Sequence, residues 1–270
     1  MSTYNQKNKS VLKFIILVFA LSIPFWVVGA VIDVEIFPGF KLFQLPLAMP
    51  ATAALILIYR EKGGAGIIVL FKRAFDWRKI HPKIWFMPII LMIPSIGLVN
   101  YIFAKITQDS VPPLHFSWPI LLGYCTVFFM TYAEELGLTG YAIDRLQPKF
   151  SALRSGILLG VLWAGYHIPG FIISGYYTWV WIFWHAIYTV AARVLCVWIY
   201  NNAGKSLFSM ALFHWAFGLF WIFLPQTGNL QKASVYYDPR LSAIMCILYA
   251  VVVTYFWGAS TLAKFRLSRK

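Results

Sequence analysis

The sequence predicts an all-α polytopic membrane protein of about eight transmembrane helices, with a polar cavity formed by helices four to seven. Two observations predict the class: of the 270 residues 60% are hydrophobic, and only 12% are charged. Soluble domains are about 45–50% apolar and about 25% charged, so this chain lacks the charged groups that a water-facing surface needs. The same composition excludes a disordered chain, a collagen-like repeat and a small disulfide scaffold.

The third observation is a series of apolar runs, each near the length of about 20 residues that crosses a bilayer. Because the bilayer offers no water to the backbone, runs of this kind must be helices. The first run is too long for a cleaved signal peptide, and no small-residue cleavage site follows it. The eight predicted spans are Phe14–Ile32, Leu42–Tyr59, Ile84–Ala104, Ile120–Leu138, Gly156–Ile173, Thr178–Tyr200, Leu207–Leu224 and Leu241–Leu262.

The basic residues predict the orientation of these spans. If the N-terminus is cytoplasmic, 18 of the 23 Lys and Arg residues lie on the cytoplasmic side, four lie outside and Arg193 lies within a span. A bias of this kind sets topology, so both termini are predicted to be cytoplasmic. The net charge of +14 is therefore mostly an orientation signal and an attraction to anionic membrane lipid, and nothing indicates a nucleic-acid partner.

The chain is predicted to be one folding unit with three parts. Residues 1–116 would hold three membrane helices and a basic cytoplasmic connector, residues 117–224 a core of four helices, and residues 225–270 a closing helix with a basic tail. The connector, Arg60–Lys83, carries Phe71, Phe75 and Trp77 among its basic residues. This amphipathic pattern predicts that it lies along the inner membrane surface.

The ionisable residues within spans are confined to helices four to seven, where they predict a shared interior site. A buried charge in hydrocarbon costs about 2.5–3.5 kcal/mol even on the lenient insertion scale, so such groups should face one another or a water-filled cavity. His185 lies further toward the outer side and is predicted to be a packing residue outside the site. The ionisable residues in these spans are Glu134, Glu135, His167, His185, Arg193 and His214.

Two carboxylates and two imidazoles in a dry cavity suit hydrolysis. A buried carboxylate can take a proton from water, and a histidine can donate to the oxyanion of a tetrahedral intermediate. Alternatively Glu134, His167 and His214 would form a ligand set for catalytic zinc. A structural polar network, a proton or ion path, a bis-histidine haem site and a small transporter stay open on these residues alone.

Four motifs, in a fixed order along the chain, favour one of these functions over the others. They are Ala133–Tyr141 with Leu146-Gln147, Gly160–Pro169, Trp198–Leu207 and Phe213–Trp215, on four successive predicted helices. Together they resemble the CPBP family, which includes the type II CAAX prenyl endopeptidases and bacterial relatives linked to bacteriocin processing and self-immunity. The resemblance implies an eight-helix intramembrane endopeptidase whose cavity opens to the cytoplasm.

Carried over by position, the resemblance implies a role for each site residue. Glu134 would activate water and Glu135 would support it, while His167 and His214 would position water and stabilise the oxyanion or bind metal, zinc being the possible cofactor. The family motif Glu-Glu-x-x-x-Arg ends here in Thr139.

A second departure lies in the last motif, where the Asn or Asp expected four residues after its histidine is Gly218. Arg193 is predicted to pair with Glu134 or Glu135 in place of the missing motif arginine, or else to extend to the inner headgroups. Arg145 is a weaker substitute because it should lie in the solvated loop.

The sequence therefore predicts a CPBP-type membrane endopeptidase, of glutamate or metallo type, in a bacterial cell membrane. Its substrate would be a peptide or protein, with prenylated and bacteriocin-like substrates both possible. The alternative is a catalytically impaired homologue that binds a peptide or a membrane partner, for example in bacteriocin immunity, because Thr139 and Gly218 replace two motif residues.

Overall fold

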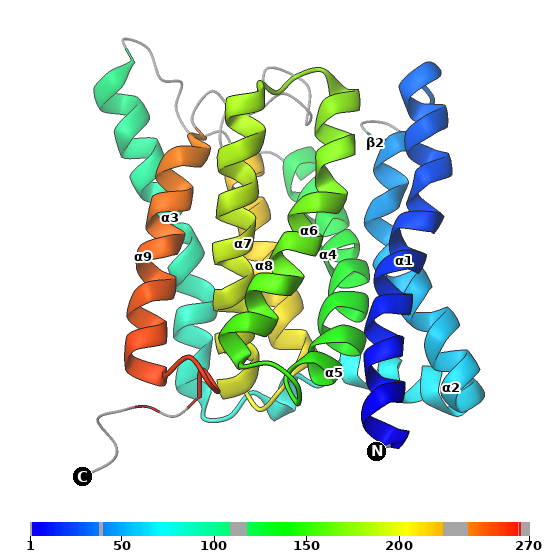
Figure 1. Ribbon diagram of the computed structural model, residues 1–270. Coiled ribbons are helices and arrows are strands. Elements are labelled where there is room, and N and C mark those ends of the chain that lie inside the picture. Colours follow the sequence, from blue (N-terminus) through cyan, green and yellow to red (C-terminus); the bar gives the residue numbers. More distant parts are fainter. Residues whose placement is uncertain (1, 38–39, 109–117, 224–236, 264, 266–270) are drawn as a thin grey trace.

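The structure is a computed structural model of the 270-residue chain, which forms a bundle of long helices (Figure 1). It describes the backbone of all residues except 1, 38–39, 109–117, 224–236, 264 and 266–270. Side chains are described over the same ranges, except for residues 2–9, 37, 119–121, 123–124, 126 and 218–223.

The long helices run alternately up and down through the bundle. They are α1 (Ser2–Val31), α2 (Met49–Ala74), α3 (Phe86–Thr107), α4 (Trp118–Gly137), α6 (Ala152–Ser174), α7 (Trp179–Asn202), α8 (Leu207–Phe223) and α9 (Pro239–Trp257). A short antiparallel pair, β1 (Glu35–Phe37) and β2 (Phe40–Lys41), follows α1. Short 3-10 turns lie at η1 (Leu42–Ala48), η2 (Trp77–Lys79) and η3 (Lys83–Trp85), and α4 continues into a π-helical segment, η4 (Leu138–Ile143), and the one-turn helix α5 (Asp144–Leu146).

The eight predicted spans coincide with the eight long helices, which confirms an all-α, multi-pass membrane architecture. Six of them are long and apolar enough to cross a membrane in the part of the chain that the structure describes, namely α1, α2, α3, α6, α7 and α9. The described part of α8, Leu207–Phe217, is a shorter apolar helix. The start of α1 and the end of α9 lie at the same end of the bundle (Figure 1), as an even number of spans requires.

Three boundaries differ from the sequence prediction. The second span begins with the 3-10 helix η1 rather than with α-helix, and the last helix ends at Trp257, because Gly258 with a φ of +75° stops it. The first half of the predicted connector is helical: α2 continues to Ala74 across a non-helical residue, Gly63, with a φ of +62°. A residue without a Cβ adopts this backbone conformation without strain, so Gly63 allows α2 to change direction.

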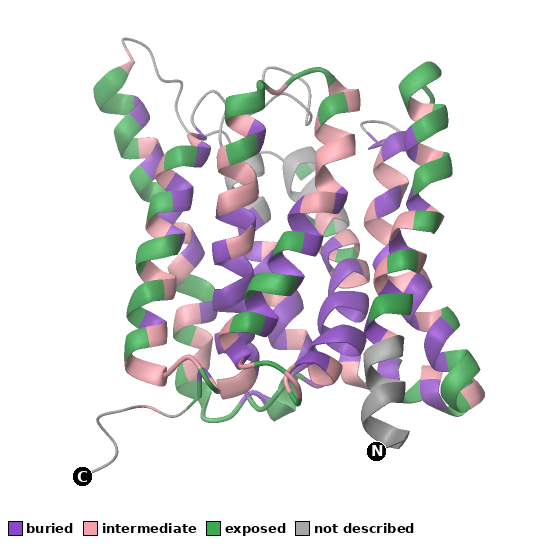
Figure 2. Ribbon diagram, viewed as in Figure 1, coloured by how far each residue is buried: buried purple, intermediate pink, exposed green. Residues whose placement is uncertain are grey.

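Figure 2 shows where the core lies. Buried residues concentrate in the lower half of the bundle, around α4, α6 and α7, whereas the outer faces of α1, α3 and α9 are exposed. The exposed residues on those faces include Ile16, Leu98 and Val251, with exposed fractions of 58–60%. Apolar side chains on the outside are expected where the surrounding medium is lipid rather than water.

Close packing between α6 and α7 brings their polar residues together. A Cβ atom added to Gly160 would lie 2.7 Å from the Cα of Val190, and one added to Gly156 would lie 3.1 Å from the Cα of Val194. Small residues at such positions allow two membrane helices to approach closely. Arg193, whose own Cβ would be 3.2 Å from a Cβ at Gly160, therefore points from α7 into the bundle beside α6.

Candidate active site

The five predicted site residues come from four helices and meet in the core. Glu134 and Glu135 lie in the last turn of α4, His167 lies in α6, Arg193 in α7 and His214 in α8. α4 can approach α2 at this level because Gly137 lacks a side chain: an added Cβ would overlap the backbone of Pro50. After α4 the helix becomes wider in the π-helical segment η4. Thr139, the second residue of η4, lies next to Glu135.

α8 is held in place by a residue far away in the sequence. Oδ1 of Asp76, in the connection that follows α2, accepts hydrogen bonds from the Ser206 hydroxyl at 2.7 Å and from the Phe208 backbone N–H at 3.2 Å. Side-chain acceptors at a helix N-terminus satisfy backbone donors that have no partner within the helix. Asp76 thus fixes the start of the helix that carries His214.

Glu135 is the most completely bonded side chain of the site. Its Oε2 accepts hydrogen bonds from the Thr139 hydroxyl at 2.5 Å and from Nη1 of Arg193 at 3.0 Å. Its Oε1 lies 2.9 Å from Nη2 of Arg193 and 2.8 Å from Nδ1 of His214. Glu135 is 0% exposed and Arg193 1% exposed, so this is a fully buried ion pair. Burial of such a pair is favourable only when additional hydrogen bonds satisfy the charges. Thr139 and His214 supply them to Glu135, whereas Nε of Arg193 has no hydrogen-bond partner among the described residues.

Glu134 has a different environment, in which it faces the two imidazoles. Its Oε2 accepts a hydrogen bond of 2.7 Å from the indole N–H of Trp163. Its Oε1 lies 3.6 Å from Nε2 of His167, and its Oε2 lies 3.8 Å from Nε2 of His214. These two separations are longer than direct hydrogen bonds, so the imidazoles face the carboxylate without being tied to it.

The hydrogen bonds fix which nitrogen of each imidazole faces Glu134. Nδ1 of His167 is 2.8 Å from the backbone carbonyl of Trp163, which can only accept, so Nδ1 carries the hydrogen. Nδ1 of His214 is 2.8 Å from the carboxylate of Glu135 and donates to it for the same reason. In both neutral imidazoles Nε2 is therefore the nitrogen with the free lone pair, and both Nε2 atoms are directed at Glu134.

Trp163 connects the two halves of the site. Its ring lies against the guanidinium of Arg193, with the Cζ atom 4.2 Å from the ring centroid, and its centroid is 4.5 Å from that of His214. A guanidinium over an indole face is attracted by the negative face of the ring. One indole therefore binds Glu134 through its edge and covers the Arg193–Glu135 pair with its face.

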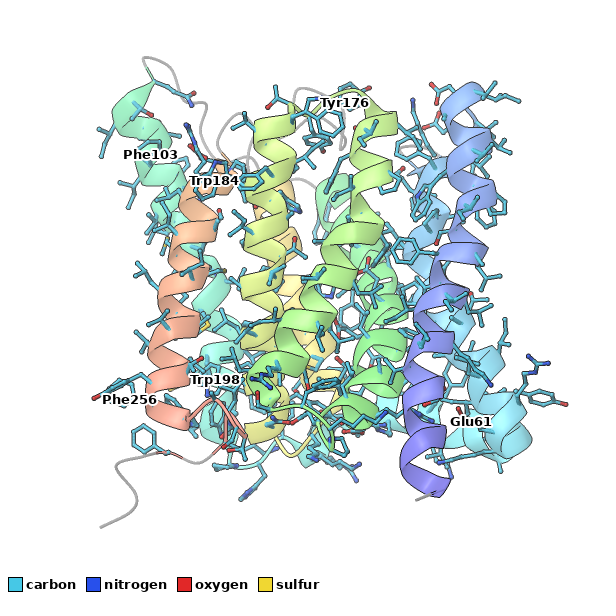
Figure 3. The ribbon with its side chains drawn as sticks, in the orientation of Figure 1. Glu61, Phe103, Tyr176, Trp184, Trp198 and Phe256 are labelled. Atoms are coloured by element: carbon cyan, nitrogen blue, oxygen red, sulfur yellow. The ribbon has the colours of Figure 1, made fainter. Side chains whose placement is uncertain are left out.

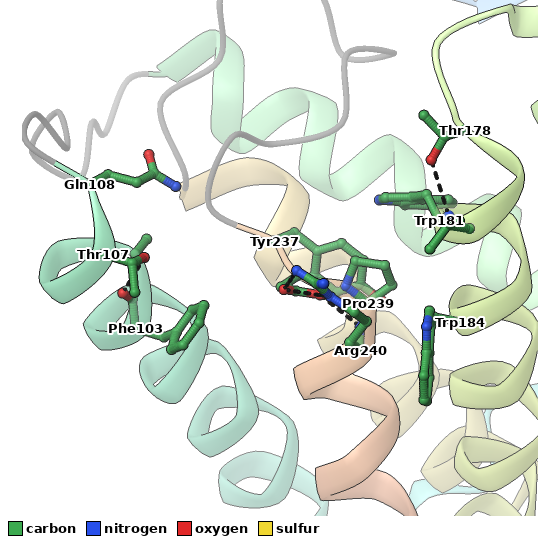
Figure 4. A pocket seen from close by; sticks show the side chains of 12 residues that line it. Phe103, Thr107, Gln108, Thr178, Trp181, Trp184, Tyr237, Pro239 and Arg240 are labelled. Atoms are coloured by element: carbon green, nitrogen blue, oxygen red, sulfur yellow. Dashed lines mark hydrogen bonds and ion pairs between the residues drawn. The ribbon is translucent and has the colours of Figure 1, made fainter.

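The site is closed in this conformation. Glu134 is 4% and His214 9% exposed, and only the His167 side chain, at 21%, is partly accessible. Two of the pockets in the described part of the chain lie near opposite ends of the bundle, and none of these residues lines either of these two. One, of about 590 Å³, lies between α3, α7 and α9 and is lined by Phe103, Trp184 and Arg240 (Figure 4). The site residues are therefore buried in this conformation, and His167 is the most accessible of them.

The structure places the remaining predicted residues as follows. Arg193 faces Glu135 rather than the headgroups, so the contact expected between it and a carboxylate is present. Arg145 lies outside the site and pairs with Glu61 at 2.6 Å. His185 also lies apart: it stacks on Trp181 with centroids 4.6 Å apart. Gly218 belongs to α8 in the part where only the backbone is described.

Two residues that sequence reasoning did not assign belong to the site. Trp163 lies four residues before His167, so the two share one face of α6, and this spacing could have indicated a second polar group there. In the sequence, Thr139 was noted only because it replaces the motif arginine. Its hydroxyl nevertheless binds the Glu135 carboxylate, which the arginine would have bound. The i to i+4 spacing from Glu135 that made the loss conspicuous is the same spacing that makes this hydrogen bond possible.

The fit of a metal ion depends on the donors around Glu134. The lone pairs of His167 and His214 and the carboxylate of Glu134 are chemically suitable ligands for zinc. Within the described residues, however, no group of three His, Cys, Asp or Glu side chains is arranged so that it could hold a metal ion. As placed, the side chains do not form a metal site, and zinc binding stays a prediction from the sequence.

Comparisons with known proteins agree with the geometry. Residues 116–220 match the family model described as "Type II CAAX prenyl endopeptidase Rce1-like", and this segment contains Glu134, Glu135, His167, Arg193 and His214. The chain is also 22% identical over 256 residues to a protein named CAAX prenyl protease 2 from the archaeon Methanococcus maripaludis, covering 88% of this chain and 90% of that protein. The resemblance predicted from the four motifs is confirmed, because both matches are to proteins described as CAAX prenyl proteases or endopeptidases.

Proposed function

We propose that the protein is an intramembrane endopeptidase that hydrolyses a peptide bond with a water molecule activated by Glu134. The observation that carries this proposal is the convergence of two imidazole Nε2 atoms on the Glu134 carboxylate, at 3.6 and 3.8 Å. A carboxylate held within reach of two groups that accept or donate one proton is suited to general acid–base chemistry. A purely structural network would instead join these groups by direct hydrogen bonds, as it does around Glu135.

The reaction needs one proton to move twice. Water bound between Glu134 and the imidazoles gives a proton to Glu134 as its oxygen attacks the carbonyl carbon, and the C–O bond forms while the carbonyl π bond opens. In its neutral form an imidazole holds the attacking water through the Nε2 lone pair, and only in the doubly protonated form, with hydrogen on both Nδ1 and Nε2, does it donate a hydrogen bond to the oxyanion. Collapse of the intermediate breaks the C–N bond, and the proton held by Glu134 passes to the leaving amine.

Glu135 and Arg193 act as positioning residues in this scheme. The Glu135 carboxylate accepts the Nδ1 hydrogen of His214, which keeps Nε2 directed at Glu134. Arg193 and Thr139 in turn bind the Glu135 carboxylate and fix its position. An acceptor behind the imidazole fixes both its tautomer and its orientation, as in other sites that rely on histidine.

The substrate class follows from the relatives and the location of the site. Glu134 lies near the end of α4 on the side of the bundle where α1 begins, which is the cytoplasmic side in the predicted orientation in a bacterial membrane (Figure 1). We infer a membrane-associated peptide as substrate, either prenylated, as the name of the relative from Methanococcus maripaludis suggests, or bacteriocin-like.

The test is cleavage by purified protein in lipid nanodiscs. A prenylated and an unprenylated fluorogenic peptide are supplied to wild type, Glu134→Gln and His185→Gln, the last as a matched control from the same membrane region outside the site. Cleavage by wild type and by the control, absent in Glu134→Gln of equal thermal stability, supports the proposal. Equal rates in wild type and Glu134→Gln would overturn it.

A second candidate function is binding without hydrolysis, and one observation favours it. The last motif carries Gly218, which has no side chain with which to orient water. A catalytically impaired homologue would hold a peptide or membrane partner, for example in bacteriocin immunity. Its expected signature is protection or partner binding that is the same in wild type and Glu134→Gln.

A further inference from the structure

A groove between α1 and α2 lies outside the catalytic site. It opens at the end of the bundle where α1 begins, encloses about 1130 Å³, and is lined on the α1 side by residues from Ser10 to Ala20. On the α2 side it is lined by Leu57 and by Arg60, Glu61 and Lys62. Figure 3 shows Glu61 at this end of the bundle, close to the first turns of α1.

The charges of the groove do not balance. Glu61 pairs with Arg145 at 2.6 Å, and Asp144 pairs with Arg73 at 3.2 Å, so both acids of the groove already have cationic partners. The remaining cations are Lys13, Arg60 and Lys62. All three are exposed, and none forms an ion pair or a side-chain hydrogen bond with the residues that the structure describes. The groove thus has three unpaired positive charges and no unpaired negative one among its described lining residues.

The other wall of the groove is apolar and runs away from these cations toward the middle of the bundle. Ile16, Leu17 and Ala20 follow Lys13 along α1, and Leu57 precedes Arg60 on α2. At about 1.5 Å per residue, the distance along α1 from Lys13 to Ala20 is about 10 Å. A site for a free inorganic anion would need only the cations, whereas this groove adds an apolar strip in which Ile16 and Ala20 are exposed and Leu57 is buried.

We propose that the α1–α2 groove binds one anionic phospholipid, with its phosphate at Lys13, Arg60 and Lys62 and an acyl chain along Ile16, Leu17, Ala20 and Leu57. The cations lie at the end of the apolar strip, which is the order of headgroup and chain in a lipid leaflet. Basic clusters next to membrane helices are known to recognise anionic headgroups, at about 1 kcal/mol per Lys or Arg near the surface.

The groove is continuous with the helix segment that follows the catalytic carboxylates. Gly140, Asp144 and Arg145 line it, and Gly140 is the residue after Thr139. Nη1 of Arg73 donates to the Gly140 carbonyl at 3.1 Å, and Nη2 of Arg73 donates to the Tyr200 hydroxyl at 2.7 Å. A lipid in the groove therefore contacts the same segment, η4, that orients Thr139 toward Glu135. The inference does not depend on the proposed protease activity, because it concerns binding alone.

The experiment measures lipid binding to the full-length protein in detergent by native mass spectrometry, with phosphatidylglycerol, phosphatidylcholine and glycerol phosphate as probes. Wild type is expected to retain one phosphatidylglycerol and to bind phosphatidylcholine about tenfold or more weakly. The variant Lys13→Gln/Arg60→Gln/Lys62→Gln should lose about 10- to 100-fold in phosphatidylglycerol affinity. A matched control, Lys72→Gln/Arg154→Gln/Lys205→Gln, removes the same charge from exposed cations that do not line the groove and should bind as wild type does.

A second variant tests the apolar wall without changing charge. Ala20→Trp fills the groove and should weaken binding, whereas Val251→Trp, on the exposed face of α9, should not. If the triple groove variant does not fold, this pair decides the question. The proposal is overturned if the two triple variants lose affinity equally, if both lipids bind equally, if Ala20→Trp binds as wild type does, or if glycerol phosphate competes as well as the lipid.

Discussion

Nη1 of Arg193, on α7, donates a hydrogen bond of 3.0 Å to Oε2 of Glu135, on α4, and the two residues are 58 positions apart in the sequence. The motif that Ala133–Tyr141 resembles would provide this cation from the same helix, four residues after Glu135, where the chain has Thr139. The site thus keeps a buried guanidinium on Glu135 but takes it from another helix. Whether the exchange preserves activity can be tested directly.

Arg193→Gln should destabilise the protein by about 3–5 kcal/mol, because it leaves the charge of Glu135 buried with no cation. Thermal unfolding in detergent measures this loss. Arg193→Lys keeps the charge but lacks the two-pronged guanidinium, so its stability should lie between those of wild type and Arg193→Gln. If Arg193 positions Glu135 and His214, the Lys variant lowers kcat more than it raises KM; unchanged kcat in a folded variant contradicts the positioning role.

Thr139→Arg should not restore a family-like site by itself. Thr139 is 3% exposed and Glu135 is already paired with Arg193, so a second guanidinium would be overpacked and would leave one positive charge without a partner. We expect lower stability than in wild type. Combining Thr139→Arg with Arg193→Ala removes the Arg193 side chain from the core and leaves Glu135 with one cation. The double variant should therefore lose less stability than the sum of the losses in the two single variants. A double-mutant cycle by thermal unfolding measures the coupling between positions 139 and 193. If the two stability changes simply add, Arg193 does not take the place of the motif arginine.

Asp76→Ala should lower the stability of the α8 N-terminus by about 1–2 kcal/mol, because two donors, the Ser206 hydroxyl and the Phe208 N–H, lose their acceptor. Hydrogen–deuterium exchange over residues 206–212 reports the change locally. Asp76→Asn is the matched control, since its amide oxygen still accepts both hydrogen bonds and should retain most of the protection. Equal exchange in wild type and Asp76→Ala would show that other contacts hold this end of α8.

Zinc content decides between the two forms of the hydrolytic mechanism. Elemental analysis of purified wild type, His167→Ala and His185→Ala separates a site at Glu134 from metal held elsewhere. A metalloenzyme should contain about one zinc per chain, and this zinc should be lost in His167→Ala and retained in His185→Ala. If chelation removes zinc from the wild-type protein, adding zinc back should restore both the zinc content and the activity. Activity that survives chelation in a zinc-free protein supports water activation by Glu134 alone.

The number and order of the membrane helices could be predicted from the sequence, because twenty apolar residues in a bilayer have one stable conformation. Each of the eight predicted spans overlaps one of the long helices in the described part of the chain, and these include the helices that carry Glu134, His167 and His214. The errors lie at the ends of spans. The region after Tyr59 was interpreted as a connector because it is basic, although α2 continues to Ala74 across the non-helical residue Gly63.

The choice between Glu134 and Glu135 as the partner of Arg193 could not be made from sequence. Adjacent residues on a helix differ in direction by about 100°, and which of them faces α7 depends on the rotation of α4 and on its approach to α2 at Gly137. The role of Trp163 was missed for a related reason. An indole N–H counts as apolar in composition, and only the position of α6 relative to α4 reveals that it binds Glu134.

The sequence by itself determined that the chain is a membrane-spanning helical protein, which helices carry its few buried polar groups, and which family its motifs resemble. These are properties of local composition and spacing, and they follow from the cost of exposing a peptide backbone or a charge to lipid. Only the tertiary structure decided that Arg193 holds Glu135 and that both imidazoles turn Nε2 toward Glu134. It also decided that three cations with no ion-pair partner among the described residues line a groove between α1 and α2. Those relationships depend on how the helices rotate and pack against one another. Close contacts such as that of Gly160 with α7 set this packing, and they join residues that are too far apart in the sequence for a local pattern to reveal them.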